Sequence, residues 1–262
     1  MDAILRARMR GSRLPGKVML PVLGRPLLSL NIERIRRART VDRLIVATGE
    51  APEDDAIAAL CRDEGVAVFR GSEADVLDRI YQCASRFELA AFAKFCADNP
   101  LIDPAVIDQV IGAWLAQPEA YDYLSNNHPP TWQDGQELEV IRTTALEHAW
   151  REARLAFQRE HVTPFLWDQP QRFRVGNVAR ADDRWYHEYR WTLDYPEDYE
   201  FIRQVCEILY PRKPDFGTED LMALLREYPE IHRLNASRAG YVWYRAHLDA
   251  LQTVKGTGHL KE

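Results

Sequence analysis

The amino-acid sequence predicts an α/β fold with a mainly parallel central sheet. In the first half of the chain, short apolar runs alternate with stretches of helical periodicity, which is the pattern of repeated βαβ units. The 262 residues, 46% of them hydrophobic and 28% charged, are enough to bury a core as one large domain or as a domain with an appendage. We therefore expect a three-layer, Rossmann-like arrangement.

Strands and helices are expected to alternate along the first 120 residues. The strands are short apolar runs, of which Leu44-Ile45-Val46-Ala47-Thr48 is the clearest. Pro52 and Pro104 stand near the start of two helices, where a missing N–H leaves no helical hydrogen bond unmade. The predicted strands are 3–5, 44–48, 66–69 and 89–96, and the predicted helices are 26–38, 52–64, 74–86 and 104–116.

The pattern changes after residue 120, where a polar, Pro-containing loop (126–136) separates two apolar runs. The predicted strands here are 121–125, 138–142, 173–178 and 187–193, and the predicted helices are 143–155, 161–168, 196–209, 218–227 and 239–251. We expect residues 255–262 to fray, because they are polar and Gly-rich. We divide the chain into a main domain of residues 1–210 and a C-terminal helical extension of residues 211–262.

The net charge and the cysteine spacing argue against several classes of protein. A net charge of −6 argues against nucleic acid as the main partner, since the cations gather locally, in residues 6–17 and 34–43. The four cysteines are far apart and form no C-x-x-C pair, which disfavours a zinc site or a disulfide framework. We find no apolar run near 18 residues and no signal-peptide pattern, so we expect a cytoplasmic protein without a membrane partner.

The loop after the first predicted strand is the most informative segment. Residues 7–19 read Ala-Arg-Met-Arg-Gly-Ser-Arg-Leu-Pro-Gly-Lys-Val-Met, with four cations, two glycines and a hydroxyl. Small residues let backbone N–H groups approach anionic oxygens, and Arg and Lys add charge-assisted bonds. Such a loop suits a polyphosphate, although a solvated surface turn is the commoner explanation for a basic loop taken alone.

Two aspartates are predicted to lie at the same edge of the sheet as this loop. Asp98 follows the strand 89–96, and Asp194 ends the strand 187–193. Ligands bind outside the carboxyl ends of strands in open sheets, so the loop, Thr48, Arg70 and the aspartates are expected to share one site. Two carboxylates can hold Mg²⁺ beside phosphate oxygens and water. The alternative is that each aspartate caps the helix that follows it.

Five segments also occur in the order seen in a known family. They are residues 13–17 (RLPGK), 70–79 (RGSEADVLDR), 98–104 (DNPLIDP), 159–164 (REHVTP) and 194–198 (DYPED). The chain resembles the cytidylyltransferases that make CMP-sugars of sialic acid and Kdo, and more closely the SpsF branch of spore coat polysaccharide biosynthesis. The likeness runs from about residue 3 to about residue 245.

This resemblance implies a nucleotidyltransferase (GT-A-like) fold and a reaction. An acceptor oxygen would attack the α-phosphate of CTP, so that CMP is transferred and pyrophosphate released. The resemblance implies that Asp98 and Asp194 bind Mg²⁺. It also implies that Arg8, Arg13 and Lys17 balance the negative charge of the triphosphate. The expected nucleotide-binding residues are Leu5, Arg6, Ala7, Arg8, Gly11, Ser12, Arg13, Lys17, Arg70, Ser72 and Asp75.

The acceptor is expected between residues 125 and 190, in a small β-rich segment that would also form a homodimer contact. Its expected ligands are Glu137, Glu139, Arg159, His161 and Arg190, which would bind a small anionic acceptor: a sugar acid, a phosphorylated polyol or a phosphonate. His161 could instead be a structural residue at a helix start. Exposed Trp132, Trp185, Tyr186 and Tyr189 would suit the dimer contact, with core packing as the alternative.

The sequence departs from the family pattern at three places. Residues 10–12 read Arg-Gly-Ser where relatives have Gly-Ser-Thr or Ala-Ser-Thr, Cys96-Ala97 replaces Thr-Gly before Asp98, and Glu137 replaces an aspartate. A nucleotidyltransferase that uses another NTP and a non-catalytic nucleotide-binding module are the alternatives. Retention of both Asp98 and Asp194 favours the enzyme.

Overall fold

The computed structural model describes residues 1–11 and 13–254. Ser12 and the predicted fraying of residues 255–262 lie outside the described residues. The chain begins with the buried strand β1 (Asp2–Arg6), which lies in the middle of a seven-stranded sheet. A short hairpin of β2 (Pro21–Val22) and β3 (Arg25–Pro26) forms a separate two-stranded sheet.

The main sheet is mixed: four neighbouring strands are parallel, and one strand runs antiparallel to both of its neighbours. Its order is β5-β4-β1-β6-β8-β7-β9, where β4 is Arg43–Gly49, β5 is Ala67–Gly71, β6 is Ala91–Cys96, β7 is Tyr123–Ser125, β8 is Glu139–Arg142 and β9 is Val175–Asn177. Strands β5, β4, β1 and β6 run parallel, whereas β8 is antiparallel to both β6 and β7. The carboxyl ends of β1 and β6 and the amino end of β8 therefore meet at one edge of the sheet.

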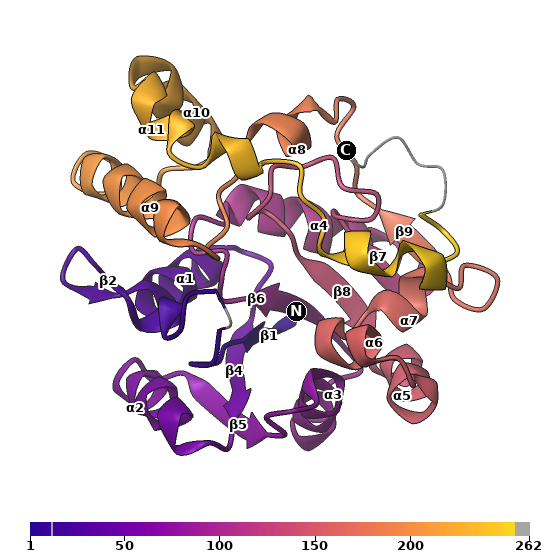
Figure 1. Cartoon of the computed structure of the whole chain (residues 1–262). Helices are drawn as coiled ribbons and strands as arrows, with labels where there is room; N and C mark the ends of the chain where they lie inside the picture. The colour runs from indigo at the N-terminus through magenta and orange to yellow at the C-terminus, as the bar shows by residue number, and fades with distance from the viewer. Residues whose placement is uncertain (12, 255–262) are drawn as a thin grey trace.

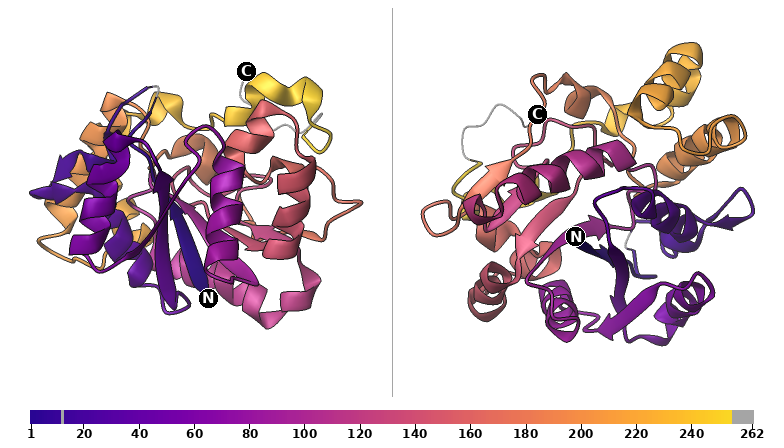
Figure 2. Two further views of the ribbon diagram at one scale, coloured as in Figure 1. Left: turned by 90° about the horizontal axis from the view of Figure 1, so that it is seen from below. Right: turned by 180° about the vertical axis from the view of Figure 1, so that it is seen from behind.

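Helices cover both faces of this sheet, as predicted (Figures 1 and 2). Successive residues of a strand point to opposite faces, so Ala3 and Leu5 pack on one side and Ile4 on the other. The first side is covered by α1 (Leu27–Arg36), α2 (Asp55–Asp63) and α4 (Pro104–Ala116), and the second by α3 (Val76–Arg86), α5 (Thr143–Glu152), α6 (Ala156–His161) and α7 (Pro164–Trp167).

A third apolar cluster joins the C-terminal helices to α1. It contains residues of α9 (Pro196–Leu209), α10 (Thr218–Glu227) and α11 (Pro229–Arg233) packed with Leu27 and Leu30. The buried Arg34 of α1 donates to the carbonyl oxygen of Phe216 at 2.9 Å, which ties the segment after residue 210 to the Rossmann-like layer. The helices α10 and α11 therefore share a core with α1 and α9.

Four predicted elements differ in the structure. Residues 187–193 are not a strand: α8 (Arg184–Glu188) precedes an extended segment that makes only a single bridge, between Asp134 and Arg190. The predicted helix 161–168 is shortened to α7, which begins at Pro164 because proline has no N–H to join a preceding helical turn, and the helix α6 before it was not predicted. The helix predicted to reach residue 155 ends at Glu152.

The predicted C-terminal helix is the fourth difference. Only 3₁₀ turns form there, in η4 (Ala236–Arg238) and η5 (Trp243–Ala250). The run Tyr241-Val242-Trp243-Tyr244 is aromatic and β-branched, which lowers helix propensity, and packing against the body of the protein decides its shape instead. The segment 125–190, expected to be β-rich, contributes β8 and β9 to the main sheet and four short helices.

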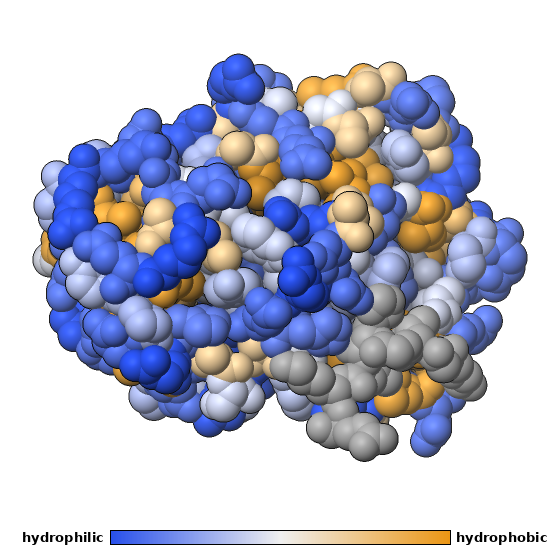
Figure 3. Space-filling view, turned by 90° about the horizontal axis from the view of Figure 1, so that it is seen from above, coloured by the Kyte–Doolittle hydropathy of each residue, from blue (hydrophilic) through white to orange (hydrophobic). Residues whose placement is uncertain are grey.

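The surface offers no sign of a bilayer-spanning element within the described residues, since none of their helices is both long and apolar enough to cross a membrane. In Figure 3, hydrophobic residues form separate small areas among hydrophilic ones on the face seen from above. Two of the aromatic residues expected at a dimer contact, Trp132 and Tyr186, are instead buried within the chain, at 6% and 3% exposure. For these two residues the alternative of core packing holds.

Candidate active site

A cavity of about 400 Å³ opens at the edge of the sheet where β1, β6 and β8 meet. It brings together most of the residues predicted for the site. From the first loop and the sheet edge it is lined by Arg6, Ala7, Arg8, Arg10, Gly11, Arg13, Lys17, Lys94, Asp98 and Asn99. From the second half of the chain it is lined by Asp134, Glu137, Glu139, Glu160, His161, Arg190 and Asp194, among others.

Strand register explains why the first loop and Asp98 are neighbours. Arg6 and Cys96 are the last residues of β1 and β6 and are paired in the parallel ladder. The backbone N–H of Ala97 continues this pairing by donating to the carbonyl oxygen of Arg6 at 3.0 Å. Both chains leave the sheet at the same point, so the cationic loop and the aspartate enter the cavity together.

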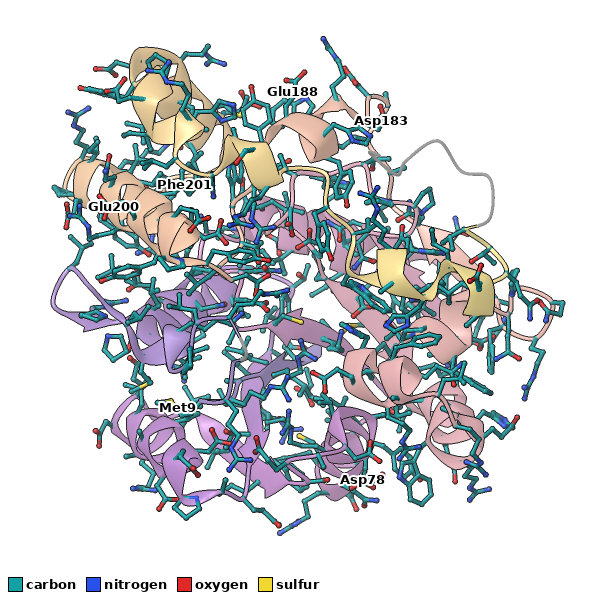
Figure 4. All side chains as sticks on the ribbon, viewed as in Figure 1. Met9, Asp78, Asp183, Glu188, Glu200 and Phe201 are labelled. Carbon is teal, nitrogen blue, oxygen red and sulfur yellow. The ribbon has the colours of Figure 1, made fainter. Side chains whose placement is uncertain are left out.

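The first loop is fixed at its base by a buried carboxylate. Asp54, 1% exposed, accepts hydrogen bonds from the N–H of Met9 at 2.7 Å and from the N–H of Gly49 at 3.0 Å. Figure 4 shows Met9 close to α2, the helix that follows Asp54. Gly16 closes the loop by donating to the carbonyl oxygen of Met9 at 2.8 Å with a φ of 71°, a left-handed conformation that favours glycine.

Asp98 and Asp194, which are 96 positions apart in the sequence, converge on the ammonium group of Lys17. Lys17 Nζ lies 2.8 Å from Asp194 Oδ1, 3.4 Å from Asp98 Oδ2 and 2.6 Å from the carbonyl oxygen of Leu193. The backbone fixes this approach, because Leu193 N donates to the carbonyl oxygen of Asp98 at 2.8 Å. Arg13 adds a second cation at 2.7 Å from Asp194 Oδ2.

The charges at this point are mutually stabilised. Burial by itself would raise the pKa of Asp194, but Lys17 and Arg13 outweigh it and hold that pKa below its usual value. Burial would likewise lower the pKa of Lys17, and the two aspartates reverse the effect and raise it. The carboxylate is therefore ionised and the amine protonated at neutral pH.

The buried guanidinium of Arg190 binds three aspartates at the base of the site. Only 3% of its side chain is exposed, and it binds Asp198 through two bonds of 2.9 Å, Asp134 at 2.6 Å and Asp194 at 3.4 Å. Asp198 also accepts from the N–H of Asp194 at 2.9 Å, as the third residue of α9 in a capping arrangement. The sequence singled out Arg190 as an acceptor ligand, whereas its guanidinium is occupied by carboxylates of the chain itself.

Glu139 stands opposite the loop in a buried polar network. It is paired with Lys94 in the antiparallel register of β6 and β8, and the two side chains form a salt bridge. Tyr123 and Thr163 donate their hydroxyls to Glu139 Oε1 at 2.8 and 2.5 Å. Burial would raise the pKa of Glu139, but Lys94 and the two hydroxyls lower it overall, so this carboxylate is ionised.

Glu137 behaves differently from Glu139. It accepts from Asn99 Nδ2 at 3.0 Å and from the N–H of Gly135 at 2.9 Å. Burial, and next the negative charge of Asp134, raise its pKa well above the usual value, and the same two kinds of effect raise the pKa of Asp134 to about 6. The two buried carboxyl groups therefore both hold their protons to higher pH than exposed ones do.

A family model that matches most of the chain shows which protein family it belongs to. The model described as cytidylyltransferase matches residues 3–227, which include the first loop, Asp98 and Asp194. The chain belongs to the cytidylyltransferase family. This confirms the resemblance found in the sequence and makes the protein a nucleotidyltransferase.

Individual relatives agree with membership of the cytidylyltransferase family. The spore coat polysaccharide biosynthesis protein SpsF of Bacillus subtilis is 33% identical over 237 residues, which cover 87% of this chain and 94% of that protein. A 3-deoxy-manno-octulosonate cytidylyltransferase of Anaeromyxobacter dehalogenans is 39% identical over 116 residues, 43% of this chain and 46% of that protein. The solved structure of a cytidylyltransferase from Leptospira borgpetersenii superposes with a TM-score of 0.82 at 27% identity, covering 88% of this chain and 95% of that one.

The paired aspartates of this cytidylyltransferase fit a magnesium ion. Two carboxyl groups already converge on a cation, the Lys17 ammonium, so the site suits a positive ion. Within residues 1–11 and 13–254 there is no group of three or more His, Cys, Asp or Glu side chains placed to hold a metal. A site with only two protein carboxylates is what Mg²⁺ uses when phosphate oxygens and water supply its remaining ligands.

Five residues predicted to contact nucleotide or acceptor lie outside the cavity lining: Leu5, Arg70, Ser72, Asp75 and Arg159. Arg70 binds Asp55 at 2.5 Å and the carbonyl oxygens of Gly49 and Ala51. Asp75 caps α3 and forms an ion pair of 2.5 Å with Arg159. Ser72 accepts a hydrogen bond from the N–H of Asp75 at 3.1 Å.

Leu5 is fully buried beneath the site, and several lining residues were missed by sequence reasoning. Glu160 is the clearest of these, since it pairs with Arg8 at 2.5 Å and its carbonyl oxygen accepts from Arg6 at 3.1 Å. It lies beside Arg159 in a segment that the sequence did single out, but only the exact turn of α6 decides which of the two enters the cavity.

Proposed function

We propose that this cytidylyltransferase transfers CMP from CTP to an oxygen of a small anionic acceptor. A bond forms between the acceptor oxygen and the α-phosphorus, the bond from that phosphorus to the bridging oxygen breaks, and pyrophosphate leaves. The convergence of Asp98 and Asp194 on one cation beside a loop of arginines carries the proposal. The name of the SpsF relative supports a role in polysaccharide biosynthesis.

The residues of the first loop have distinct roles in this proposal. Arg13 and Lys17 lie against Asp194 and supply positive charge where the triphosphate would be held. Arg8 is held toward the cavity by Glu160, and Arg10 is an extra cation at its rim. Preorganised charges of this kind stabilise the developing charge of a phosphoryl transfer without moving at the moment of reaction.

Asp98 and Asp194 are proposed as the ligands of Mg²⁺. When bound, this ion would polarise the α-phosphate and help to orient the attacking oxygen. Lys17 must then give up at least part of its contact with the two carboxylates. Asn99, Thr192 and the Arg190 brace keep the aspartates in position, because Thr192 Oγ1 donates to Asn99 Oδ1 at 2.9 Å and to the carbonyl oxygen of Asp98 at 3.1 Å.

A direct test measures pyrophosphate release with Mg²⁺ and each of CTP, UTP, ATP and GTP over a panel of sugar acids, polyol phosphates and phosphonates. The proposal expects turnover with CTP that falls by roughly a hundredfold or more in Asp98→Asn and Asp194→Asn. Asp108→Asn is the matched control, because Asp108 is also ion-paired, with Arg39, but lies outside the cavity. Full activity of both site variants, or preference for another NTP, contradicts the proposal.

We also propose a homodimer, as the resemblance implies. Light scattering of the purified protein at micromolar concentration should give twice the chain mass of 30.3 kDa. A mass of one chain over the whole concentration range contradicts it.

A further inference from the structure

The last described stretch of the chain forms one wall of the cavity. We call residues 239–254 the C-terminal strap. They follow the part matched by the family model, which ends at residue 227, and yet Tyr241, Val242, Trp243 and Tyr244 line the cavity. In Figure 1 this yellow segment runs from α11 toward α6 and α7. The strap is therefore a part of the site that lies beyond the range of the family model.

The strap is fixed to the protein on both sides of the cavity. Before it, Arg238 forms an ion pair of 2.6 Å with Glu197 at the start of α9. At its other end, the carboxylate of Asp168 accepts hydrogen bonds from the N–H groups of Gln252 and Thr253 and from the Thr253 hydroxyl, at 2.8 to 3.0 Å. Leu251 is buried in the core shared with the helices of that face. Contacts with the rest of the protein therefore hold the strap at both of its ends.

The strap and its partners present rings to the cavity. Trp243 stacks on His161 with centroids 3.5 Å apart and an interplanar angle of 12°. Tyr244 packs against Trp167 at 6.0 Å, and Trp167 packs against His128 at 3.9 Å. These five side chains all line the cavity, and we call them the aromatic wall.

The rings of the aromatic wall carry no formal charge themselves. Burial, and next the positive charge of Arg6, lower the pKa of His161 to about 3, and burial lowers the pKa of His128 to about 4. Both imidazoles are neutral at pH 7. Cations lie at one edge of this wall, because Arg6 donates to the carbonyl oxygen of Glu160 at 3.1 Å and Arg8 pairs with the Glu160 carboxylate, next to His161. A charged group placed against these rings would lose water, and the nearby cations already have partners in the chain, Arg6 and Arg8 on Glu160 and Lys94 on Glu139.

We propose that the C-terminal strap selects the acceptor, with Trp243 as the specificity-determining residue. The part of the acceptor remote from the attacking oxygen is uncharged and presents an apolar face to Trp243 and Tyr244, and the acceptor's anionic group faces the cations of the sheet edge. This inference rests on the proposed transfer from CTP, because it assigns the wall to the acceptor half of the same cavity. Rings that fill such a wall discriminate between ligands by packing.

Calorimetry in the absence of turnover tests the strap independently of the reaction. Pairs of sugar acids that share a carboxylate and differ only in a free or a phosphorylated remote hydroxyl are titrated into the protein, and Mg-CTP is titrated separately. The wild type should bind the acid with the free hydroxyl at least roughly tenfold more tightly than its phosphorylated partner. Trp243→Ala should weaken binding of the former by roughly tenfold and leave the CTP dissociation constant within about twofold.

Two further variants make the result decisive. Trp150→Ala removes another half-buried tryptophan, which packs on Tyr81 outside this cavity, and should change neither binding constant. If Trp243→Ala fails to fold by circular dichroism, Trp243→Phe decides, with an expected loss of roughly threefold for the acceptor alone.

The inference is overturned if the wild type binds none of the acids or prefers the phosphorylated member. It is also overturned if the Trp243 variant that folds binds the acceptor as the wild type does, or loses CTP to the same extent. Failure of the proposed function has a different signature, because the wild type would then release no pyrophosphate from CTP whatever the acceptor binding shows.

Discussion

Removal of the Lys17 ammonium is the perturbation whose effect the structure specifies most fully. In Lys17→Met, Asp98 and Asp194 lose the cation they share, and the carbonyl oxygen of Leu193 loses a donor at 2.6 Å. Hydrogen bonds to charged groups contribute ~1.5–3 kcal/mol each, and the contact at 3.4 Å is weak. The Lys17 side chain is only 16% exposed, so solvent screens its ion pairs little. We therefore expect the free energy of unfolding to fall by about 2–3 kcal/mol, most of it from the lost ion pairs.

This loss has a defined pH dependence. The pKa of Asp194 is lowered in the folded protein, so its contribution is present above the usual value of 3.8 and is lost as the pH falls through the folded pKa. The pKa of Lys17 is raised, so its contribution is present below the usual value of 10.5 and is lost as the pH rises through the folded pKa. The difference between wild type and variant should be full between these values and shrink outside them.

Thermal unfolding with and without Mg²⁺ is the assay. The melting temperature of Lys17→Met should be lower than that of the wild type by roughly 5–10 °C at pH 7. Because the Lys17 ammonium then no longer occupies the place between the two carboxylates, Mg²⁺ at ten times its dissociation constant should restore about 1.4 kcal/mol to the variant and clearly less to the wild type, where the ammonium competes. Equal melting temperatures, or a larger Mg²⁺ effect on the wild type, would refute the reasoning.

Three further substitutions test other parts of the account. Arg190→Met leaves the fully buried Asp198 without its guanidinium, and urea unfolding should show a loss of about 3–5 kcal/mol; a loss below about 1 kcal/mol would show that the brace is not structural. Asp54→Ala frees the N–H of Met9 at the base of the first loop, and calorimetry should show Mg-CTP binding weakened by roughly tenfold, whereas unchanged affinity would mean that the loop is held by other contacts. Arg70→Met removes only contacts outside the cavity, so CTP affinity should stay within about twofold of the wild type; a clear loss would support the nucleotide role predicted from sequence.

The sequence predicted the site best for the residues that directly follow parallel strands, because the strand order fixes where those residues lie. Arg6 and Cys96 end neighbouring parallel strands, so the first loop and Asp98 had to leave the sheet together, and this was predictable from the apolar runs alone. Asp194 was expected at the same edge as the end of a strand, 187–193, which the structure does not contain. The segment before it is not a strand of the sheet but an extended chain held by Arg190 and by hydrogen bonds to Asp98 and Asp134.

Side-chain partners could not be predicted in the same way. Arg190, Arg159 and Arg70 are cations near the site in sequence, but each is bound by an aspartate of the chain, which a linear pattern does not reveal. The strap was missed for a related reason. The aromatic run around Trp243 was predicted as a helix, and its place on the cavity depends on the anchor at Asp168, 75 positions earlier in the sequence.

The position of a bound metal tests the central claim most directly. A crystal structure with CTP and Mn²⁺ in place of Mg²⁺, recorded at an energy where manganese scatters anomalously, would locate the ion without reference to any assumed site. The account predicts an anomalous peak in contact with both Asp98 and Asp194 and with an oxygen of the triphosphate, and Lys17 moved from its place between the two carboxylates. Bound CTP with the metal elsewhere, and with Lys17 still joining the two aspartates, would contradict it.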